Sequence, residues 1–322
     1  MGDAGTWVGP GEASDKLDLA KIEPAIAPEA ADLHAALQTA KIAGLFKMRS
    51  EASRLAAGAQ SWFKRLSAAA VISTAVATLT SGLLLYGAGS EASPATVVEG
   101  LVRWVKDNKP YILWIQIVAL FVSALVASVL ASQNYAERWQ EQRNRAELLR
   151  RQIFDEVLTL AKAKVPNLLG AADPGNPIAQ ALEFFRRYEH ELQITFYRTA
   201  STRYARVATR LSWLTAVLAG LAAITGALSG FGGSTPVASA FLGISVPILL
   251  SAAQSWRASS RDSDKLTAYG KAKQALESSL LDIDSVRARA AMGDAAAVGA
   301  YVNSVHLIMT TETDAWRTAS TS

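Results

Sequence analysis

The sequence contains no cysteine among its 322 residues, and it has only three histidines. The missing cysteine excludes a disulfide-stabilised fold, a cysteine-ligated metal site and a thiol nucleophile. His34, His190 and His306 are more than a hundred residues apart, so no two of them have metal-ligand spacing. The sequence also lacks a phosphate-binding glycine loop and a Gly-x-Ser-x-Gly turn. We therefore expect neither an enzyme nor a bound cofactor or metal, and we interpret His190 as part of a solvated helix face.

Charge is also absent from three long stretches, residues 66–90, 110–136 and 211–256. A bilayer core takes about 20 apolar residues per helix, so each of the first two stretches predicts one span. The third stretch is too long for one span and is interrupted by the Gly-rich segment 229–236, which predicts two spans and a tight turn. The sequence thus predicts an all-α integral membrane protein whose four spans are residues 66–86, 111–133, 211–231 and 236–256.

Basic residues are concentrated on one side of these predicted spans. Of the 32 Lys and Arg residues, 29 fall in the three segments 1–65, 137–210 and 257–322. Because Lys and Arg mark the cytoplasmic ends of membrane helices, these segments are predicted to be cytoplasmic. We expect a multi-pass protein of the inner (cytoplasmic) membrane, with both termini in the cytoplasm.

The plan of long helix, two-span hairpin and long helix occurs twice. Proline and glycine around residue 174 disfavour helix between the two copies. Both hairpins leave and re-enter the same side, so the repeat is parallel, unlike transporters built from inverted repeats. We predict four segments, which are a disordered N-terminal segment (1–30), a first two-span domain (31–166), a linker (167–177) and a second two-span domain (178–322).

The polar segments beside the spans have helical periodicity and predict a cytoplasmic helical bundle. Apolar residues recur every three or four positions, as expected for one face of a helix; they include Leu33, Leu37, Met48, Ala52, Leu55, Ala146, Leu149, Ile153, Val157 and Leu160. If residues 111–165 form one continuous helix, it is about 80 Å long at 1.5 Å per residue and extends far beyond the bilayer. Asp294 is predicted to cap a last helix.

Hydroxyl groups are the main polar feature of the predicted spans. Four of them share one side of the first span and are our candidates for lining a conduit, namely Ser67, Thr74, Thr78 and Ser81. The alternative is that each hydroxyl bonds a carbonyl of its own helix or packs between helices. Because no span contains a charged residue, a passive pore is favoured over a coupled pump.

Small residues at four-residue spacing mark the faces on which membrane helices approach closely. We assign oligomer packing to Ser128, Ser132, Ala223, Gly243 and Ser251. Packing within each hairpin is the alternative explanation for the same residues. The predicted partners are therefore the lipid bilayer and further copies of the chain, and we expect no nucleic acid.

The segment from Trp139 to Arg150, which contains Arg-Asn-Arg-Ala-Glu, resembles the region after the second span of SLATT domains, two-span effector domains of bacterial conflict systems. The second half resembles another SLATT type at Ala253–Trp256, Tyr269 and Leu276–Leu280. The resemblance implies two such domains in tandem and a cytoplasmic interface formed by Trp139, Arg143, Arg145, Glu147 and Trp256. The same Arg and Glu residues also fit ordinary helix-surface charges.

The resemblance further implies an oligomeric, pore-forming effector of bacterial antiphage or conflict signalling, with a nucleotide-sensing protein as its partner. The chain departs from the family pattern because it carries no fused sensor domain. Two alternatives stay open, a non-conducting membrane scaffold and a housekeeping ion channel.

Overall fold

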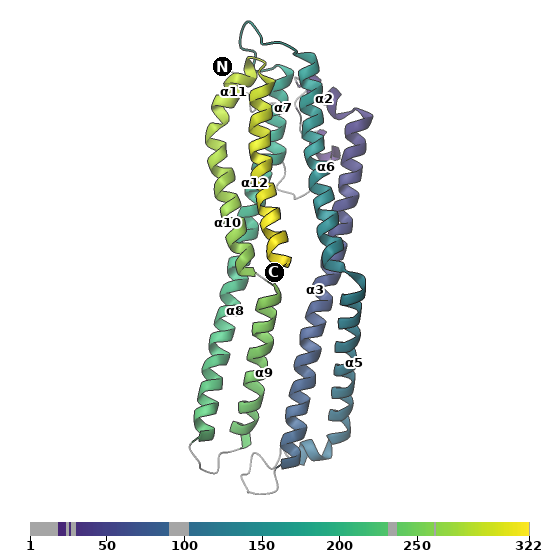
Figure 1. The fold of residues 1–322 in the computed structure, drawn as a ribbon, viewed down its shortest axis with the longest axis vertical. Helices are drawn as coiled ribbons and strands as arrows, with labels where there is room; N and C mark the ends of the chain where they lie inside the picture. The colour runs from purple at the N-terminus through teal and green to yellow at the C-terminus, as the bar shows by residue number, and fades with distance from the viewer. Residues whose placement is uncertain are drawn as a thin grey trace. The chain divides into compact units, whose positions relative to one another are not determined.

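The computed structural model describes residues 19–23, 26, 30–89, 103–230, 237–260 and 262–321 of the chain. These residues form helices and no strand, which agrees with the predicted all-α class (Figure 1). The helices are α1 (Leu19–Ile22), α2 (Ala31–Leu37), α3 (Ala40–Gly89), α5 (Lys109–Gln133), α6 (Tyr135–Lys164), α7 (Pro177–Phe185), η2 (Arg186–Glu191), α8 (Leu192–Gly230), α9 (Val237–Ser260), α10 (Asp262–Ser279), η3 (Leu280–Asp282), α11 (Ile283–Ala291) and α12 (Ala295–Thr321).

The chain divides into two compact units, and each unit takes segments from both halves of the sequence. Unit 1 comprises Met1–Ala57, Trp139–Tyr204 and Ser263–Ser322, and unit 2 comprises Gly58–Arg138 and Ala205–Asp262. Helices α3 and α8 each contribute residues to both units without a helix break. Each unit is therefore built from segments that are distant in the sequence.

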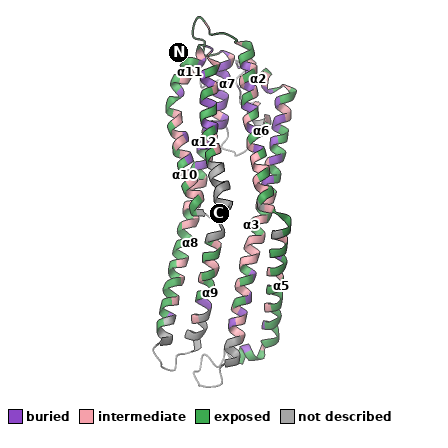
Figure 2. Cartoon of the chain, viewed as in Figure 1, coloured by how far each residue is buried: buried purple, intermediate pink, exposed green. Residues whose placement is uncertain are grey.

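Unit 1 is built around α7, which packs against α2, α11 and α12 (Figure 1). Every residue from Ile178 to Phe185 is buried. Figure 2 shows α7 as mostly buried, in contrast to the more exposed helices. The predicted stripe on α6 is confirmed, since Ala146, Leu149, Ile153 and Val157 all lie in the core. A helix that is buried on all sides must lie inside a bundle, which agrees with the central place of α7.

Polar side chains cap the N-termini of α7 and α12. Asn176 caps α7, because its Oδ1 accepts hydrogen bonds from Ile178 N and Ala179 N at 2.9 and 3.0 Å. The Nδ2 of the same side chain donates to Ala290 O at 3.0 Å, which attaches the end of the predicted linker to α11. Asp294 caps α12 as predicted, since its Oδ1 accepts from Ala297 N at 3.0 Å.

Three of the described helices are long and apolar enough to cross a membrane, namely Ala40–Leu84, Lys109–Leu130 and Pro177–Thr225. They cover most of the first three predicted spans, and they indicate a membrane protein. Helix α9 covers most of the fourth predicted span, 236–256, and continues through Pro247. The outer loop at 90–102 and the turn at 231–236 lie outside the described residues.

The structure differs from the sequence-based picture in three places. The helix considered over residues 111–165 is interrupted at Asn134, whose φ of 46° is left-handed, a conformation that asparagine tolerates better than most residues. Part of the segment predicted to be disordered is helical in α1, and Ile22 and Ile26 are buried in the core. On α3, Met48 and Leu55 are exposed, whereas the predicted Ala52 is buried together with Ile42, Leu45 and Phe46.

Candidate functional site

The four hydroxyl residues predicted to line a conduit lie on the unit 2 part of α3, beside α5. Thr74 Oγ1 and Ser123 Oγ of α5 share a hydrogen bond of 3.0 Å. Thr78 donates to Thr74 O at 2.8 Å, and Ser81 donates to Ala77 O at 2.8 Å. Ser67 is half-buried, whereas Thr74 and Thr78 are exposed in the single chain. The stripe therefore combines bonds within its own helix with a direct contact to the neighbouring helix.

Gln116 also takes part in this polar contact, and its role was not predicted from the sequence. Its Nε2 donates to Ser81 Oγ at 2.8 Å, which joins α5 to α3 a second time. The available signal was that Gln116 is the one amide side chain between residues 110 and 132. We call Ser81, Thr74, Thr78, Gln116 and Ser123 the polar seam of the first hairpin.

The residues assigned to oligomer packing are largely unused within the single chain. Ser128, Ser132, Ala223 and Ser251 are exposed, and a Cβ added at Gly243 would meet no described atom within 4 Å. Small residues that are exposed leave surface on which another helix could approach closely.

A buried ionic centre in unit 1 surrounds the π-helix η2. The Glu189 carboxylate forms an ion pair with the Nε of Arg150 on α6, and both side chains are almost completely buried. Arg49 of α3 is buried nearby and adds a second guanidinium to the same environment. In the part of the chain that the structure describes, the other oxygen of Glu189, Oε1, has no hydrogen-bond partner.

Burial and the mutual attraction of these charges act in opposite directions. Burial raises the pKa of the Glu189 carboxyl to about 7, although the charge of Arg150 opposes this shift. Burial and the charge of Arg150 lower the pKa of Arg49 to about 10. For Arg150, burial lowers the pKa, but Glu189 and Glu147 outweigh it, so the net pKa is raised. Removing one partner would leave a charge buried without compensation.

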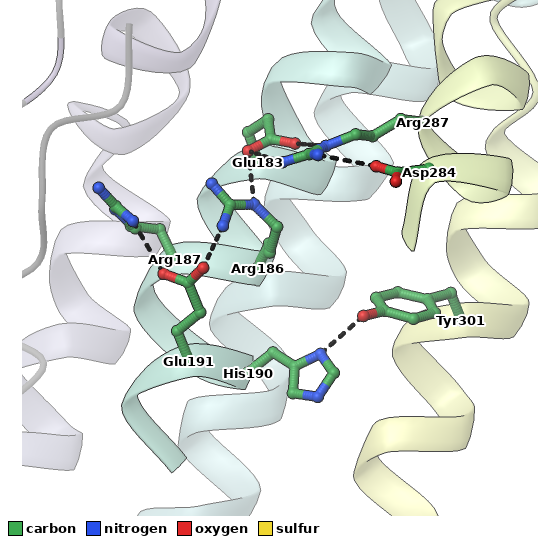
Figure 3. Close-up of polar contacts among 8 residues, drawn as sticks. All are labelled: Glu183, Arg186, Arg187, His190, Glu191, Asp284, Arg287 and Tyr301. Carbon is green, nitrogen blue, oxygen red and sulfur yellow. Dashed lines mark hydrogen bonds and ion pairs between the residues drawn. The ribbon is translucent and has the colours of Figure 1, made fainter. Parts of the chain in front are cut away.

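The π-helix brings together groups that an α-helix would separate. Arg186 forms ion pairs with Glu183 at 2.7 Å and with Glu191, five positions further on (Figure 3). Residues five apart point about 140° away from each other on an α-helix, but they share a side on a π-turn, whose hydrogen bonds run from i to i+5. Glu183 is bonded on its other side by Arg287 of α11 at 2.6 Å. Such π-turns within α-helices are frequent at functional sites.

His190 is fully buried, which corrects its interpretation as part of a solvated helix face. Its Nδ1 lies 2.6 Å from the Tyr301 hydroxyl of α12 (Figure 3), and its Nε2 lies 2.8 Å from the Leu276 carbonyl of α10. Since a carbonyl can only accept, Nε2 carries the proton and Nδ1 accepts from the tyrosine. Burial lowers the pKa of His190. Both nitrogens are engaged, so His190 links three helices as a neutral imidazole.

The residues predicted to form a cytoplasmic interface are divided between the units. Trp139, Arg143, Arg145 and Glu147 belong to α6 in unit 1, whereas Trp256 belongs to α9 in unit 2. Arg145 is exposed, and Glu147 lies 3.9 Å from Arg150 at the edge of the buried ionic centre. The side chain of Glu147 therefore connects the segment that carries the family resemblance to the charges around η2.

A cavity of about 240 Å³ lies between α2 and α6 in unit 1. Its lining is mainly apolar, and the side chains of Asp32 and Lys164, which are both among the lining residues, form an ion pair with each other. This cavity offers little to a phosphate group, which binds through several cationic or N–H donors. Across the described ranges, no three His, Asp or Glu side chains gather in a way that could hold a metal ion.

Residues 50–155 match a family model described as "Protein of unknown function (DUF4231)". The matched range runs from α3 to α6 and includes the whole polar seam, Arg150 and the segment that begins at Trp139. No curated protein and no solved structure matches the chain significantly.

Proposed function

We propose that the chain is an oligomeric membrane channel or pore-forming effector, in which unit 2 conducts passively and unit 1 receives the signal that gates it. The observation that carries the proposal is the polar seam. It places Thr74 and Thr78, both exposed in the single chain, on an otherwise apolar hairpin. A ring of such hydroxyls around an assembly axis would offer polar surface to water and ions without any charged residue.

Assembly is supported by the apolar surface of unit 2. Large side chains of α5 are exposed, among them Trp114, Ile117 and Phe121. Soluble monomers rarely expose contiguous apolar surface of this kind, so lipid or further copies of the chain are the expected neighbours. The unused small residues around Gly243 add close-approach sites for a homo-oligomer.

The chain path supports a four-span topology with a tandem repeat. The first helix of each hairpin, α3 or α8, passes between units without interruption. The second helix of each hairpin ends close to a unit boundary, at Asn134 after α5 and at residue 260 after α9. We therefore retain α9 as the fourth span, both termini in the cytoplasm and the inner membrane as the location. Cysteines placed singly at Ser93 and Ser322 of this cysteine-free chain test the topology, because only Ser93 is expected to react with an impermeant reagent in intact cells.

A role in bacterial antiphage or conflict signalling rests on the SLATT resemblance, whose segment Trp139–Arg150 lies inside the matched range. In this proposal a nucleotide-sensing partner protein acts on unit 1 through the segment of α6 that carries Arg143 and Arg145. Arg150, which pairs with Glu189, lies one to two turns further along α6. In this proposal the signal changes the packing of the buried ionic centre.

The test is ion flux through liposomes that contain the purified chain alone. A conducting oligomer gives flux, and replacing Thr74 and Thr78 with valine lowers its single-channel current, since valine keeps the shape but removes the hydroxyls. The matched control is Thr225→Val on α8, a buried hydroxyl that bonds only its own helix. Absence of flux from a correctly assembled oligomer would overturn the proposal.

A non-conducting membrane scaffold is the second candidate, and one observation favours it. Three of the four predicted lining hydroxyls already donate or accept hydrogen bonds within the hairpin, so helix packing could account for them. A scaffold predicts no flux from the correctly assembled chain, and an effect of the valine variant on packing or assembly instead. A housekeeping channel predicts flux without any dependence on infection.

A further inference from the structure

An exposed stripe along α8 passes from charged to aromatic to aliphatic side chains. It begins with two arginines, continues with a tryptophan and ends with aliphatic side chains, and all of these residues belong to unit 2. At about 100° per residue the six positions fall within an arc of about 80°. The stripe consists of Arg206, Arg210, Trp213, Val217, Leu221 and Ile224, all of them exposed.

The spacing along the stripe matches one leaflet of a bilayer. At 1.5 Å per residue, Trp213 and Ile224 are about 16 Å apart along the helix, close to half of a core about 30 Å thick. Arg210 lies one turn before Trp213, at the level where headgroups are expected. Trp213 is 70% exposed, and tryptophan is enriched at the membrane–water interface.

We propose that this stripe binds one anionic phospholipid, with the two guanidinium groups on its phosphate and an acyl chain along Val217, Leu221 and Ile224. Guanidinium groups bind phosphate through paired, charge-assisted hydrogen bonds. No carboxylate among the described residues forms an ion pair with Arg206 or Arg210, which leaves both charges available to a lipid. The proposal requires α8 to lie in a bilayer, but it does not require the protein to conduct.

The corresponding face of α3 is less complete. Trp62, Arg65 and Ile72 share one exposed side of that helix, but there is a single arginine, and Val76 and Leu79 further along the same side are half-buried. Compared with α3, α8 therefore carries more complete positions for headgroup, interface and acyl-chain contacts on one exposed side.

The test is native mass spectrometry of the full chain, titrated with phosphatidylglycerol and, separately, with phosphatidylcholine of the same acyl chains. We expect tighter binding of phosphatidylglycerol. Arg206→Gln together with Arg210→Gln should weaken the binding of phosphatidylglycerol about 25-fold, at about fivefold per arginine. The binding of phosphatidylcholine should change little. Arg206→Lys with Arg210→Lys should keep most of the preference.

The matched control removes the same charge elsewhere, by Lys47→Gln with Arg54→Gln on α3. Both residues are exposed and share one side of the helix, but they belong to unit 1. If the control weakens the binding of phosphatidylglycerol as much as the α8 variant does, net charge explains the binding and the site is refuted. A change of oligomeric state with unchanged lipid binding would also overturn the proposal, because the stripe would then be a contact between chains. If the double variant fails to fold, Arg210→Gln alone should show the fivefold effect.

Discussion

Units 1 and 2 are both helical, but they place their polar side chains in opposite ways. Unit 1 buries complete charges, among them Glu189, Arg150 and Glu183, and pairs them across helices that are distant in sequence. Unit 2 exposes large apolar side chains and holds uncharged hydroxyl and amide groups between α3 and α5. The proposed function places unit 1 in water and unit 2 in lipid, and these surroundings accept a polar and an apolar exterior respectively.

The comparison predicts that polar substitutions are far more damaging in unit 1 than in unit 2. The reason is that a buried charge depends on its partner, whereas a hydroxyl in a membrane helix can bond its own backbone. Four substitutions test this, in order of decreasing effect.

The largest effect is expected for Glu189→Gln. It removes the nearer of the two carboxylates that offset the buried charge of Arg150 and leaves only Glu147, at 3.9 Å, which should lower the free energy of unfolding by about 3–5 kcal/mol. Hydrogen exchange of the α7 amides in the full chain in detergent measures this locally. Adding Arg150→Met should recover much of the loss. Glu277→Gln, which breaks the exposed pair with Arg198 at 3.1 Å, is the control and should change stability by less than about 1 kcal/mol. Equal effects of Glu189→Gln and the control would contradict the assigned role of the ionic centre.

The second prediction concerns pH and His306. Burial lowers its pKa to about 4, and nearby Arg151 and Arg150 add to the shift. As the pH falls, His306 is protonated in the unfolded chain before it is protonated in the folded chain. The stability that neutral His306 contributes is therefore complete above pH 6.5 and is lost as the pH falls towards 4. Glu189, with a pKa raised to about 7, acts in the opposite sense, because its contribution is lost as the pH rises from about 4.5 through 7.

His306→Gln separates the two contributions. Relative to the native chain, the variant should gain about 2 kcal/mol between pH 7.5 and pH 5, since glutamine does not titrate. Thermal unfolding of both proteins at the two pH values gives this difference, from which the Glu189 contribution cancels. A difference that does not depend on pH would show that His306 titrates normally in the folded state.

The third prediction is that Asn176→Ala lowers the free energy of unfolding by about 2 kcal/mol, at the upper end for an N-cap. The side chain both caps α7 and donates to Ala290 O, so alanine removes two kinds of contact. Asn176→Ser should be intermediate, because serine keeps the acceptor but loses the donors. The control is Asn303→Ala, an exposed position of α12, for which thermal unfolding should change little.

Much of the fold follows from local sequence patterns, whereas the ionic centre does not. The charge-free stretches located the first three apolar helices, and the spacing of Leu149, Ile153 and Val157 gave the buried face of α6. These patterns depend only on helix geometry. Glu189 and His190 lie in a charged segment that is typical of a surface. Their burial depends on partners in other segments, Arg150 on α6 and Tyr301 on α12, which no local pattern specifies.

The smallest effect is expected in unit 2, at the hydrogen bond between Gln116 Nε2 and Ser81 Oγ. Interhelical hydrogen bonds of this kind contribute about 0.6 kcal/mol on average, because the separated helices also find partners for these groups. A double-mutant cycle of Gln116→Leu and Ser81→Ala, followed by thermal unfolding in one detergent, measures the coupling directly. Ser81 can still donate to Ala77 O after Gln116 is replaced, so neither single variant should leave a buried group unsatisfied. A coupling of about 3 kcal/mol or more would place this bond on the scale of the buried ion pairs, and it would break the contrast between the two units.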